Sequence, residues 1–298
     1  MEQTISVLRR DITNKGDHYE ISLSKEYTAT MLEEAGMTTC KTATTPGTAA
    51  NKTSNDDHDN IPVDKDEHAF YRRIVGKLQW MTYTRPDLSF TTKDLARSLQ
   101  QPTYLDMKKM KHALRYLQGT KDYKFILRPT TIPGNKDPPI LDVYFDADWA
   151  GCTTTRKSTT GFAIKYLGAT IHFGSRTQAI VALSSAESDL YSIGTGAQES
   201  LHIRNFLVET ILTSKLQIRI HTDSTSGKSI ATRIGSSKNA KHIDLKYLFI
   251  QQLVHNGILS VHKIGTLDNI ADIFTKYVTA EILNKHLYNV GLLSPDNN

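Results

Sequence analysis

Hydrophobic and polar positions divide the chain into two regions of different periodicity. Between residues 67 and 119 apolar side chains recur at spacings of three and four, which predicts amphipathic helices. From Ile140 onward, short stretches alternate apolar and polar positions, as in "LDVYFDAD", and this pattern predicts strands. We therefore expect an α/β domain preceded by a smaller, mostly helical domain.

The α/β region begins with three strands in succession and then alternates helices with strands. Short turns join the first three strands, which is typical of antiparallel neighbours. The expected order is β-β-β-α-β-α-α-β-α over residues 140–280. Residues 281–298 are expected to form a C-terminal helix and tail.

Two segments rich in turn-forming residues separate the expected domains. Residues 41–66 are polar and predict a flexible linker, and residues 131–139 predict a second linker. Residues 1–40 predict a hairpin followed by a helix that begins after Ser24 as its N-cap. Residues 67–130 form the helical region.

Composition narrows the class of protein. The chain has 298 residues, of which 39% are hydrophobic and 22% charged, as in globular proteins. No apolar run approaches the ~20 residues of a membrane helix, and the N-terminus lacks the apolar core of a secretory signal. The two cysteines, Cys40 and Cys152, form no CxxC motif, so we expect an intracellular protein without disulfides or a membrane partner. The net charge of +5 is compatible with a polyanionic ligand.

Four acidic residues, each from a separate element, suggest a site for a hard divalent cation, because Mg²⁺ prefers oxygen ligands. They are Asp146 in the first strand, Glu187 at a helix start, Asp223 at a strand end and Asp272 at another helix start. Each also has an ordinary interpretation: a solvated strand residue, a capping box with Ser184, an N-cap, and a first-turn acid. The spacing alone leaves both interpretations open.

Six stretches of the chain, taken in order, carry a family resemblance over most of residues 5–278. They are "YRRIVGKLQWMTYTRPDLSF", "ALRYLQGTKDY", "DADWAGCTTTRKSTTGF", "SRTQAIVALSSAESDLY", "KHIDLKYLFI" and "NIADIFTK". Together they resemble the C-terminal part of the Pol polyprotein of copia-type LTR retrotransposons. The resemblance implies a ribonuclease H-like mixed five-stranded sheet with flanking helices over residues 140–280. It implies that the preceding residues are the end of a reverse transcriptase palm followed by thumb- and connection-like helices.

The resemblance also implies an activity, which is metal-dependent hydrolysis of the RNA strand of RNA–DNA hybrids. Two Mg²⁺ ions, for which Mn²⁺ can substitute, would be held by Asp146, Glu187, Asp223 and Asp272. The family thus favours metal binding over capping for Glu187. The remainder of the Pol polyprotein would be a partner, and the location would be the cytoplasm, in a virus-like particle, or the nucleus.

Two polar turns and one basic loop are candidates for contact with the hybrid, because A-form duplexes are recognised through phosphates and 2′-hydroxyls. The turns contain Arg156, Lys157, Ser158, Thr159, Ser175 and Arg176. The loop contains Lys238, Lys241 and His242 before a helix whose N-terminus could hold a phosphate. Ordinary solvated loops are the alternative for all of these residues.

The sequence departs from a complete polymerase. It contains no Tyr-x-Asp-Asp turn, so we expect polymerase activity only from a full-length polyprotein. Residues 265–269 also lack the loop histidine that cellular ribonucleases H carry before their last carboxylate. The alternative function is a catalytically inactive retroelement remnant that acts at most as a nucleic-acid-binding module.

Overall fold

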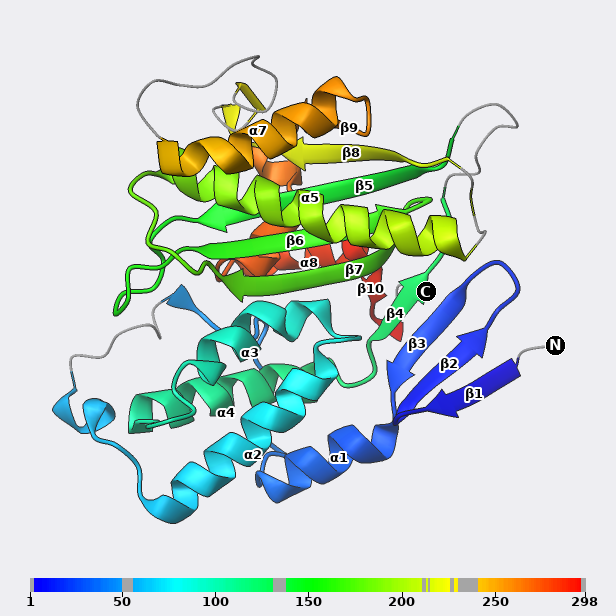
Figure 1. Cartoon of the computed structure of the whole chain (residues 1–298). Helices are drawn as coiled ribbons and strands as arrows, with labels where there is room; N and C mark the ends of the chain where they lie inside the picture. The colour runs from blue at the N-terminus through cyan, green and yellow to red at the C-terminus, as the bar shows by residue number, and fades with distance from the viewer. Residues whose placement is uncertain are drawn as a thin grey trace. The chain divides into compact units, whose positions relative to one another are not determined.

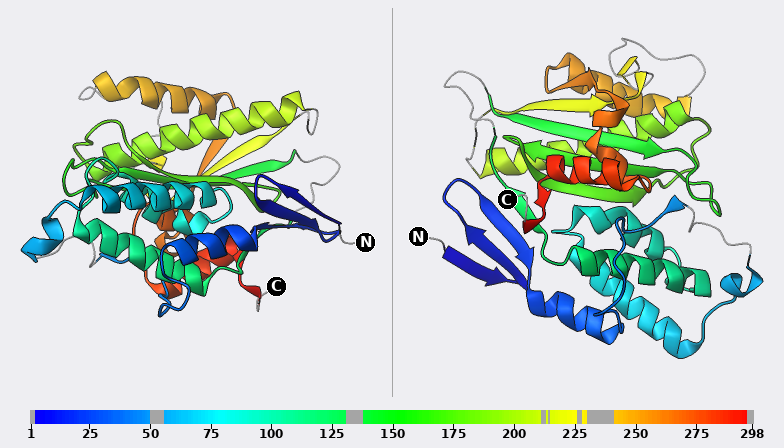
Figure 2. Two further views of the ribbon diagram at one scale, coloured as in Figure 1. Left: turned by 90° about the horizontal axis from the view of Figure 1, so that it is seen from below. Right: turned by 180° about the vertical axis from the view of Figure 1, so that it is seen from behind.

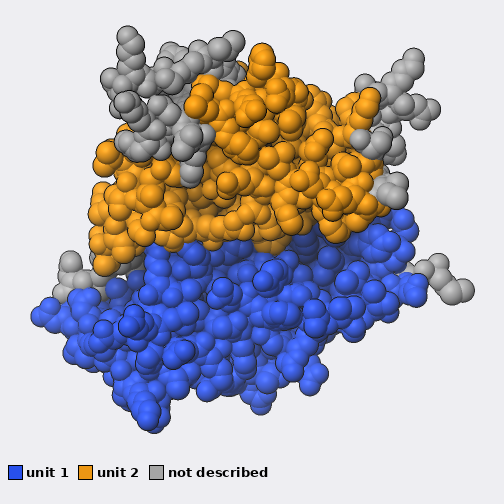
Figure 3. Space-filling model, in the orientation of Figure 1, with its two compact units in different colours: residues 1–128, 276–298 blue, residues 129–275 orange. Residues whose placement is uncertain are grey.

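The computed structural model divides the chain into two compact units (Figures 1 and 3). Unit 1 comprises Met1–Arg128 and Lys276–Asn298, and unit 2 comprises Pro129–Thr275. The structure describes residues 3–49, 56–130, 138–210, 213, 215–225, 228–229 and 241–295. Most of the expected linker 131–139 lies outside this range, and the C-terminal helix that the sequence suggested as a separate tail is part of unit 1.

Unit 2 is built on a mixed five-stranded sheet in the order β7-β6-β5-β8-β9. Its strands are β5 (Ile140–Asp148), β6 (Thr159–Tyr166), β7 (Ala169–Thr177), β8 (Gln217–Thr222) and β9 (Leu259–Lys263). The β5–β6 and β6–β7 pairs are antiparallel, whereas β5–β8 and β8–β9 are parallel. The α/β class predicted from the alternation is confirmed.

Two helices, α5 (Ser185–Glu209) and α7 (Lys241–His255), cover one face of this sheet (Figures 1 and 2). Leu141, Val143 and Phe145 of β5 are buried in a core that includes Leu190 and Ile193 of α5. The short 3-10 helices η4 (Thr266–Asp268) and η5 (Ile270–Phe274) follow β9. The last helix of the expected order over residues 140–280 is thus the short 3-10 helix η5.

The opposite face of β5 is polar because side chains alternate along a strand. Asp142 accepts hydrogen bonds from Arg219 Nε at 2.9 Å and from Arg219 Nη2 at 3.0 Å. His221 Nε2 lies 2.8 Å from the same carboxylate and stacks on Tyr144 with ring centroids 4.5 Å apart. The alternation that fills the core therefore also places the polar side chains of β5 and β8 on one surface.

Unit 1 combines helices with a second five-stranded sheet in the order β1-β2-β3-β4-β10. Its strands are β1 (Gln3–Val7), β2 (Arg10–Asn14), β3 (Tyr19–Leu23), β4 (Lys124–Leu127) and β10 (Leu292–Leu293). Before the turn of the expected hairpin the chain turns once more, at Leu8 and Arg9, which have φ of 51° and 60°. Two consecutive left-handed residues are typical of a tight hairpin turn, so this stretch forms two strands.

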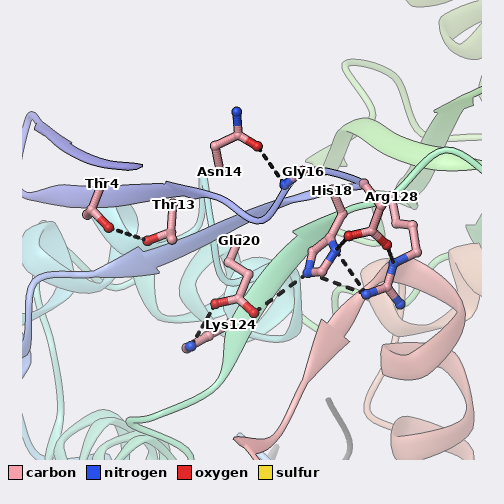
Figure 4. Close-up of polar contacts among 9 residues, drawn as sticks. Thr4, Thr13, Asn14, Gly16, His18, Glu20, Lys124 and Arg128 are labelled. Carbon is pink, nitrogen blue, oxygen red and sulfur yellow. Dashed lines mark hydrogen bonds and ion pairs between the residues drawn. The ribbon is translucent and has the colours of Figure 1, made fainter. Parts of the chain in front are cut away.

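A polar cluster lies along β3 and β4 of this sheet (Figure 4). Lys124 Nζ donates to Glu20 Oε2 at 2.7 Å, and Arg128 Nε lies 3.4 Å from Asp17 Oδ2. His18 Nδ1 lies 2.7 Å from Asp17 Oδ1. These contacts link β4 to the turn before β3, more than 100 residues away in sequence.

Most helices of unit 1 begin at a residue whose side chain caps the helix. The helices include α1 (Lys25–Glu34), α2 (Lys65–Met81), the 3-10 helix η3 (Pro86–Leu88), α3 (Ser89–Ala96), α4 (Tyr104–Gly119) and α8 (Ala280–Val290). Ser24 caps α1 as predicted, and Thr103 caps α4 in a capping box with Asp106.

The segment expected as a flexible linker, residues 41–66, is in part held against α4. Arg115 Nε donates to the carbonyl of Lys41 at 2.7 Å, and His112 Nε2 lies 3.0 Å from that of Thr45. The 3-10 helix η2 (Asp57–Asn60) also falls within it. Among the described residues no helix is long and apolar enough to cross a membrane.

Candidate metal centre

The strand topology of unit 2 brings Asp146 and Asp223 together. Asp146 lies near the end of β5 on its polar face, and Asp223 directly follows β8. Because β5 and β8 are parallel neighbours, their carboxyl ends meet at the same edge of the sheet. Two residues 77 positions apart in sequence therefore meet at one edge of the sheet.

Asp272 on η5 completes a group of three carboxylates. One ligand oxygen from each of Asp146, Asp223 and Asp272 lies within 4.8 Å of the other two. Asp272 is buried, whereas Asp146 and Asp223 are half-buried. Close carboxylates repel one another unless a cation or a proton lies between them. A set of hard oxygen donors at this separation fits a divalent cation such as Mg²⁺.

Two buried side chains hold η5 beside β5. Asn269 Nδ2 donates to the carbonyl of Phe145 at 3.0 Å, and Asn269 Oδ1 accepts from the Ala271 amide at 3.2 Å. Thr275 Oγ1 donates to Asp146 Oδ2 at 2.6 Å. The hydrogen bonds at either end of η5 thus fix where Asp272 lies relative to Asp146.

Gly161 on β6 makes room for this approach. It is the register partner of Asp146 across the β5–β6 pair. A Cβ atom at Gly161 would lie 2.7 Å from Phe274 Cβ and 2.8 Å from the carbonyl oxygen of Ala271. Any residue other than glycine would therefore push η5 away from the sheet.

Glu187, which the family resemblance mapped to the metal site, lies at the start of α5. Its Oε2 accepts a hydrogen bond from the Leu183 amide at 2.7 Å, and its own amide donates to Ser184 Oγ at 3.2 Å. In the described part of the chain, the group of ligand-forming carboxylates does not include it. The Ser184 cap is present, but Glu187 accepts from the Leu183 amide and not from the amide of Ser184, so the reciprocal half of the predicted capping box is not formed. Metal binding by Glu187 stays a prediction.

Asp189, two residues further along α5, is the carboxylate that sequence reasoning missed. The pKa of Asp189 is raised to about 6. Burial is the main cause, and the charges of Asp146 and Asp223 raise the pKa further, while a hydrogen bond from the Ser224 side chain lowers it. Those electrostatic contacts place Asp189 beside the three-carboxylate group. Helical spacing indicates that Asp189 lies on the face of α5 that packs on the sheet. It precedes the buried Ile193 by four residues and Gly196, whose added Cβ would meet the Phe145 ring, by seven.

Relatives of this chain occur among the Pol polyproteins of transposons. No family model matches the chain. It is 32% identical over 270 residues to the retrovirus-related Pol polyprotein from transposon RE2 of Arabidopsis thaliana, covering 90% of this chain and 18% of the relative. It is 32% identical over 276 residues to the corresponding polyprotein from transposon TNT 1-94 of Nicotiana tabacum, covering 91% of this chain and 20% of the relative.

These matches confirm the resemblance of the chain to copia-type retrotransposon Pol polyproteins. The chain spans about a fifth of the length of these relatives. Among solved structures, ribonuclease H1 from Halobacterium salinarum aligns with 49% of this chain and 98% of its own, at 12% identity and a TM-score of 0.34. The description of the fold therefore depends on the strand order of this chain and not on that similarity. Unit 2 itself has the expected mixed five-stranded sheet with flanking helices.

The first of the two polar turns predicted to contact the hybrid exposes some of its side chains and buries others. Ser158 and Thr159 are buried, and Ser158 Oγ accepts a hydrogen bond from the Ala150 amide at 3.1 Å, so neither hydroxyl is offered to a ligand. Arg156 is exposed at the turn and Lys157 is half-buried. These two cations are the part of this turn that a phosphate can reach.

The second turn and the basic loop contribute less. Arg176 is exposed and pairs with Glu199, whose other oxygen lies 3.1 Å from His172, while Ser175 is half-buried. In the basic loop Lys238 lies outside the described residues. Lys241 and His242 begin α7, but their side chains lie outside the described part of the structure.

Proposed function

We propose that unit 2 is a ribonuclease H that hydrolyses the RNA strand of RNA–DNA hybrids with the help of divalent cations. The observation that carries this proposal is the convergence of Asp146, Asp223 and Asp272 within 4.8 Å on a ribonuclease H-like sheet. The similarity of the chain to the Pol polyproteins of transposons supports it.

The donor set determines which cofactor is proposed. Carboxylate oxygens favour Mg²⁺, with Mn²⁺ as a substitute, over metals that prefer nitrogen or sulfur ligands. We propose Asp146, Asp223 and Asp272 as ligands and Asp189 as the fourth carboxylate in place of Glu187. Bound divalent cations would supply Lewis acidity at the scissile phosphate.

The protein residues around the carboxylates would hold them ready for that cation. Thr275 donates to one oxygen of Asp146 and so helps to fix the orientation of that carboxylate. Asn269 and Thr275 are fully buried and hold η5, so Asp272 needs little rearrangement. Fixed ligands reduce the ordering cost of binding, which is the usual benefit of a second layer of hydrogen bonds.

A cleavage assay tests the proposal directly. The chain would be incubated with labelled RNA annealed to DNA in Mg²⁺ or Mn²⁺, alongside EDTA, Asp146→Asn and the control Asp57→Asn, which changes an exposed acid in unit 1. We expect RNA cleavage in the wild type and the control, and none with EDTA or Asp146→Asn. Binding of the hybrid without cleavage by the wild type in either metal would instead indicate the inactive binding module.

A further inference from the structure

Trp149 is a large apolar side chain that remains half-exposed beside the proposed nuclease site. It follows directly after β5, three residues beyond Asp146, and 47% of it is exposed. Its indole Nε1 donates to the carbonyl of Ala182 at 2.9 Å, and Ala182 is buried. The ring is therefore pinned between the segment that carries Asp146 and the segment that leads into α5 and Asp189.

Two further apolar side chains flank the anchoring residue. Val181 is 47% exposed and Leu183 is 80% exposed, on either side of Ala182. The exposed parts of these three apolar side chains contribute no burial energy to the folded chain. Exposed apolar patches commonly mark binding surfaces. Trp149, Val181 and Leu183 are called the apolar rim below.

Cations lie on the loop that continues from this rim. The Ala150 amide donates to Ser158 Oγ at 3.1 Å, and the Cys152 amide donates to the Lys157 carbonyl at 3.2 Å. The loop thus folds back so that the turn carrying Arg156 and Lys157 returns to the backbone after Trp149. Aromatic rings next to cations are the combination with which proteins bind nucleic-acid strands.

We propose that the apolar rim is a substrate contact, in which Trp149 packs against the sugars in the minor groove of the hybrid while Arg156 and Lys157 engage its phosphates. This inference rests on the proposed ribonuclease H function and names a determinant of substrate binding for that site. Bases inside a duplex are already stacked, and extruding one is energetically unfavourable. The wide, shallow minor groove of an A-form duplex instead presents sugar faces that an indole ring can cover.

The fluorescence of the chain allows a direct test, because it contains two tryptophans, Trp80 and Trp149. In an Asp146→Asn background, Trp80→Phe leaves Trp149 as the reporter, and Trp149→Phe leaves Trp80 for comparison. A labelled RNA–DNA hybrid would be titrated while its anisotropy reports binding. We expect the Trp149 emission to change in parallel with anisotropy.

The affinity of Trp149 variants for the hybrid distinguishes a direct contact of the indole with the hybrid from a purely structural role of that ring. We expect Trp149→Ala to weaken hybrid binding about tenfold, as loss of an aromatic contact to nucleic acid does. Trp149→Phe keeps a ring but loses the hydrogen bond to the buried carbonyl of Ala182, so we expect it to retain most of the affinity although its melting temperature falls. Equal loss in both variants would show that the indole only joins the two segments, and would overturn the inference.

The two proposals fail differently. Cleavage of the hybrid with a Trp149 emission that stays constant at saturation would overturn the substrate contact and leave the nuclease intact. A Trp149 response to the hybrid without cleavage by the unsubstituted chain in Mg²⁺ or Mn²⁺ would overturn the nuclease and leave the contact intact. Absence of hybrid binding would overturn both.

Discussion

Asn269 donates a hydrogen bond to the main-chain carbonyl of Phe145 at 3.0 Å, across 124 residues of sequence. The donor precedes η5 and the acceptor is the residue before Asp146, so one bond joins the two elements that carry Asp272 and Asp146. Both side chains are buried, with Asn269 fully enclosed. The distance between the two carboxylates therefore depends on a side chain that is not itself a ligand.

Replacing Asn269 with alanine tests that dependence. We expect Asn269→Ala to lower the free energy of unfolding by about 1–3 kcal/mol, because a buried carbonyl loses its donor. The rate of RNA cleavage should fall as well. A higher Mg²⁺ concentration should restore part of that rate, because the substitution changes the positions of the proposed ligands and not the ligands themselves. Urea unfolding and Mg²⁺ titration of activity measure both effects. Asn205→Ala, at an exposed position of α5, is the control; equal effects of the two substitutions would contradict the role of Asn269.

Gly161→Ala should displace η5. The added Cβ would lie 2.7 Å from both Phe274 Cβ and Thr275 Cγ2. We expect a destabilisation of about 1–3 kcal/mol from overpacking, with loss of cleavage. Gly76→Ala is the matched control, because its Cβ meets nothing within 4 Å and helix α2 should gain about 0.5–1 kcal/mol. A folded Gly161→Ala variant of wild-type activity would show that η5 tolerates the shift.

Asp189→Asn and Glu187→Gln compare the two acids at the start of α5. We expect Asp189→Asn to weaken Mg²⁺ affinity, measured by calorimetry, about 10–100-fold. Glu187→Gln keeps an acceptor for the Leu183 amide, so it should leave Mg²⁺ affinity unchanged and cost less than about 1 kcal/mol of stability. The reverse result would return Glu187 to the metal site.

The raised pKa of Asp189, about 6, predicts a pH dependence with a definite sign. An aspartate in the unfolded chain has a pKa near ~3.9. The folded state therefore binds this proton more tightly, and the stability it contributes is full below that value and lost as the pH rises through about 6. In EDTA the wild type should lose stability relative to Asp189→Asn between pH 4 and pH 7, as judged by melting temperature at ~1 pH unit intervals.

Divalent cations should reverse that trend. A cation neutralises the carboxylate charges and competes with the proton on Asp189, so the Mg²⁺-induced rise in melting temperature should grow from about pH 5 to about pH 7. In Asp189→Asn the same rise should be smaller and nearly independent of pH. A Mg²⁺ effect that is equal at both pH values in the wild type would contradict the coupling of Asp189 to the metal.

Local sequence patterns predicted most elements of unit 2. They failed where contacts between residues distant in sequence determine the local conformation. Period-two alternation located β5, and the Ser184 cap located the start of α5, because both depend on nearest neighbours. The stretch around Asp272 reads as a helix, yet it forms the 3-10 segment η5 because Asn269 and Thr275 tie it to β5. In unit 1, the return of β10 to pair with β4 could not be predicted from a two-residue strand.

The sequence by itself determined the α/β class and the resemblance to Pol polyproteins, because strand alternation and the matching motifs are local properties of the chain. Through that resemblance it predicted Asp146, Asp223 and Asp272 as ligands. The tertiary structure decided which acid of α5 faces the site. Glu187 and Asp189 both lie in the first turns of one helix, and the sequence favoured Glu187. Only the packing of α5 on β5 shows that Glu187 turns back to its own helix start while Asp189 is within reach of the charges of Asp146 and Asp223. A side chain two residues away on a helix points about 200° around its axis, so helix rotation assigns the two roles.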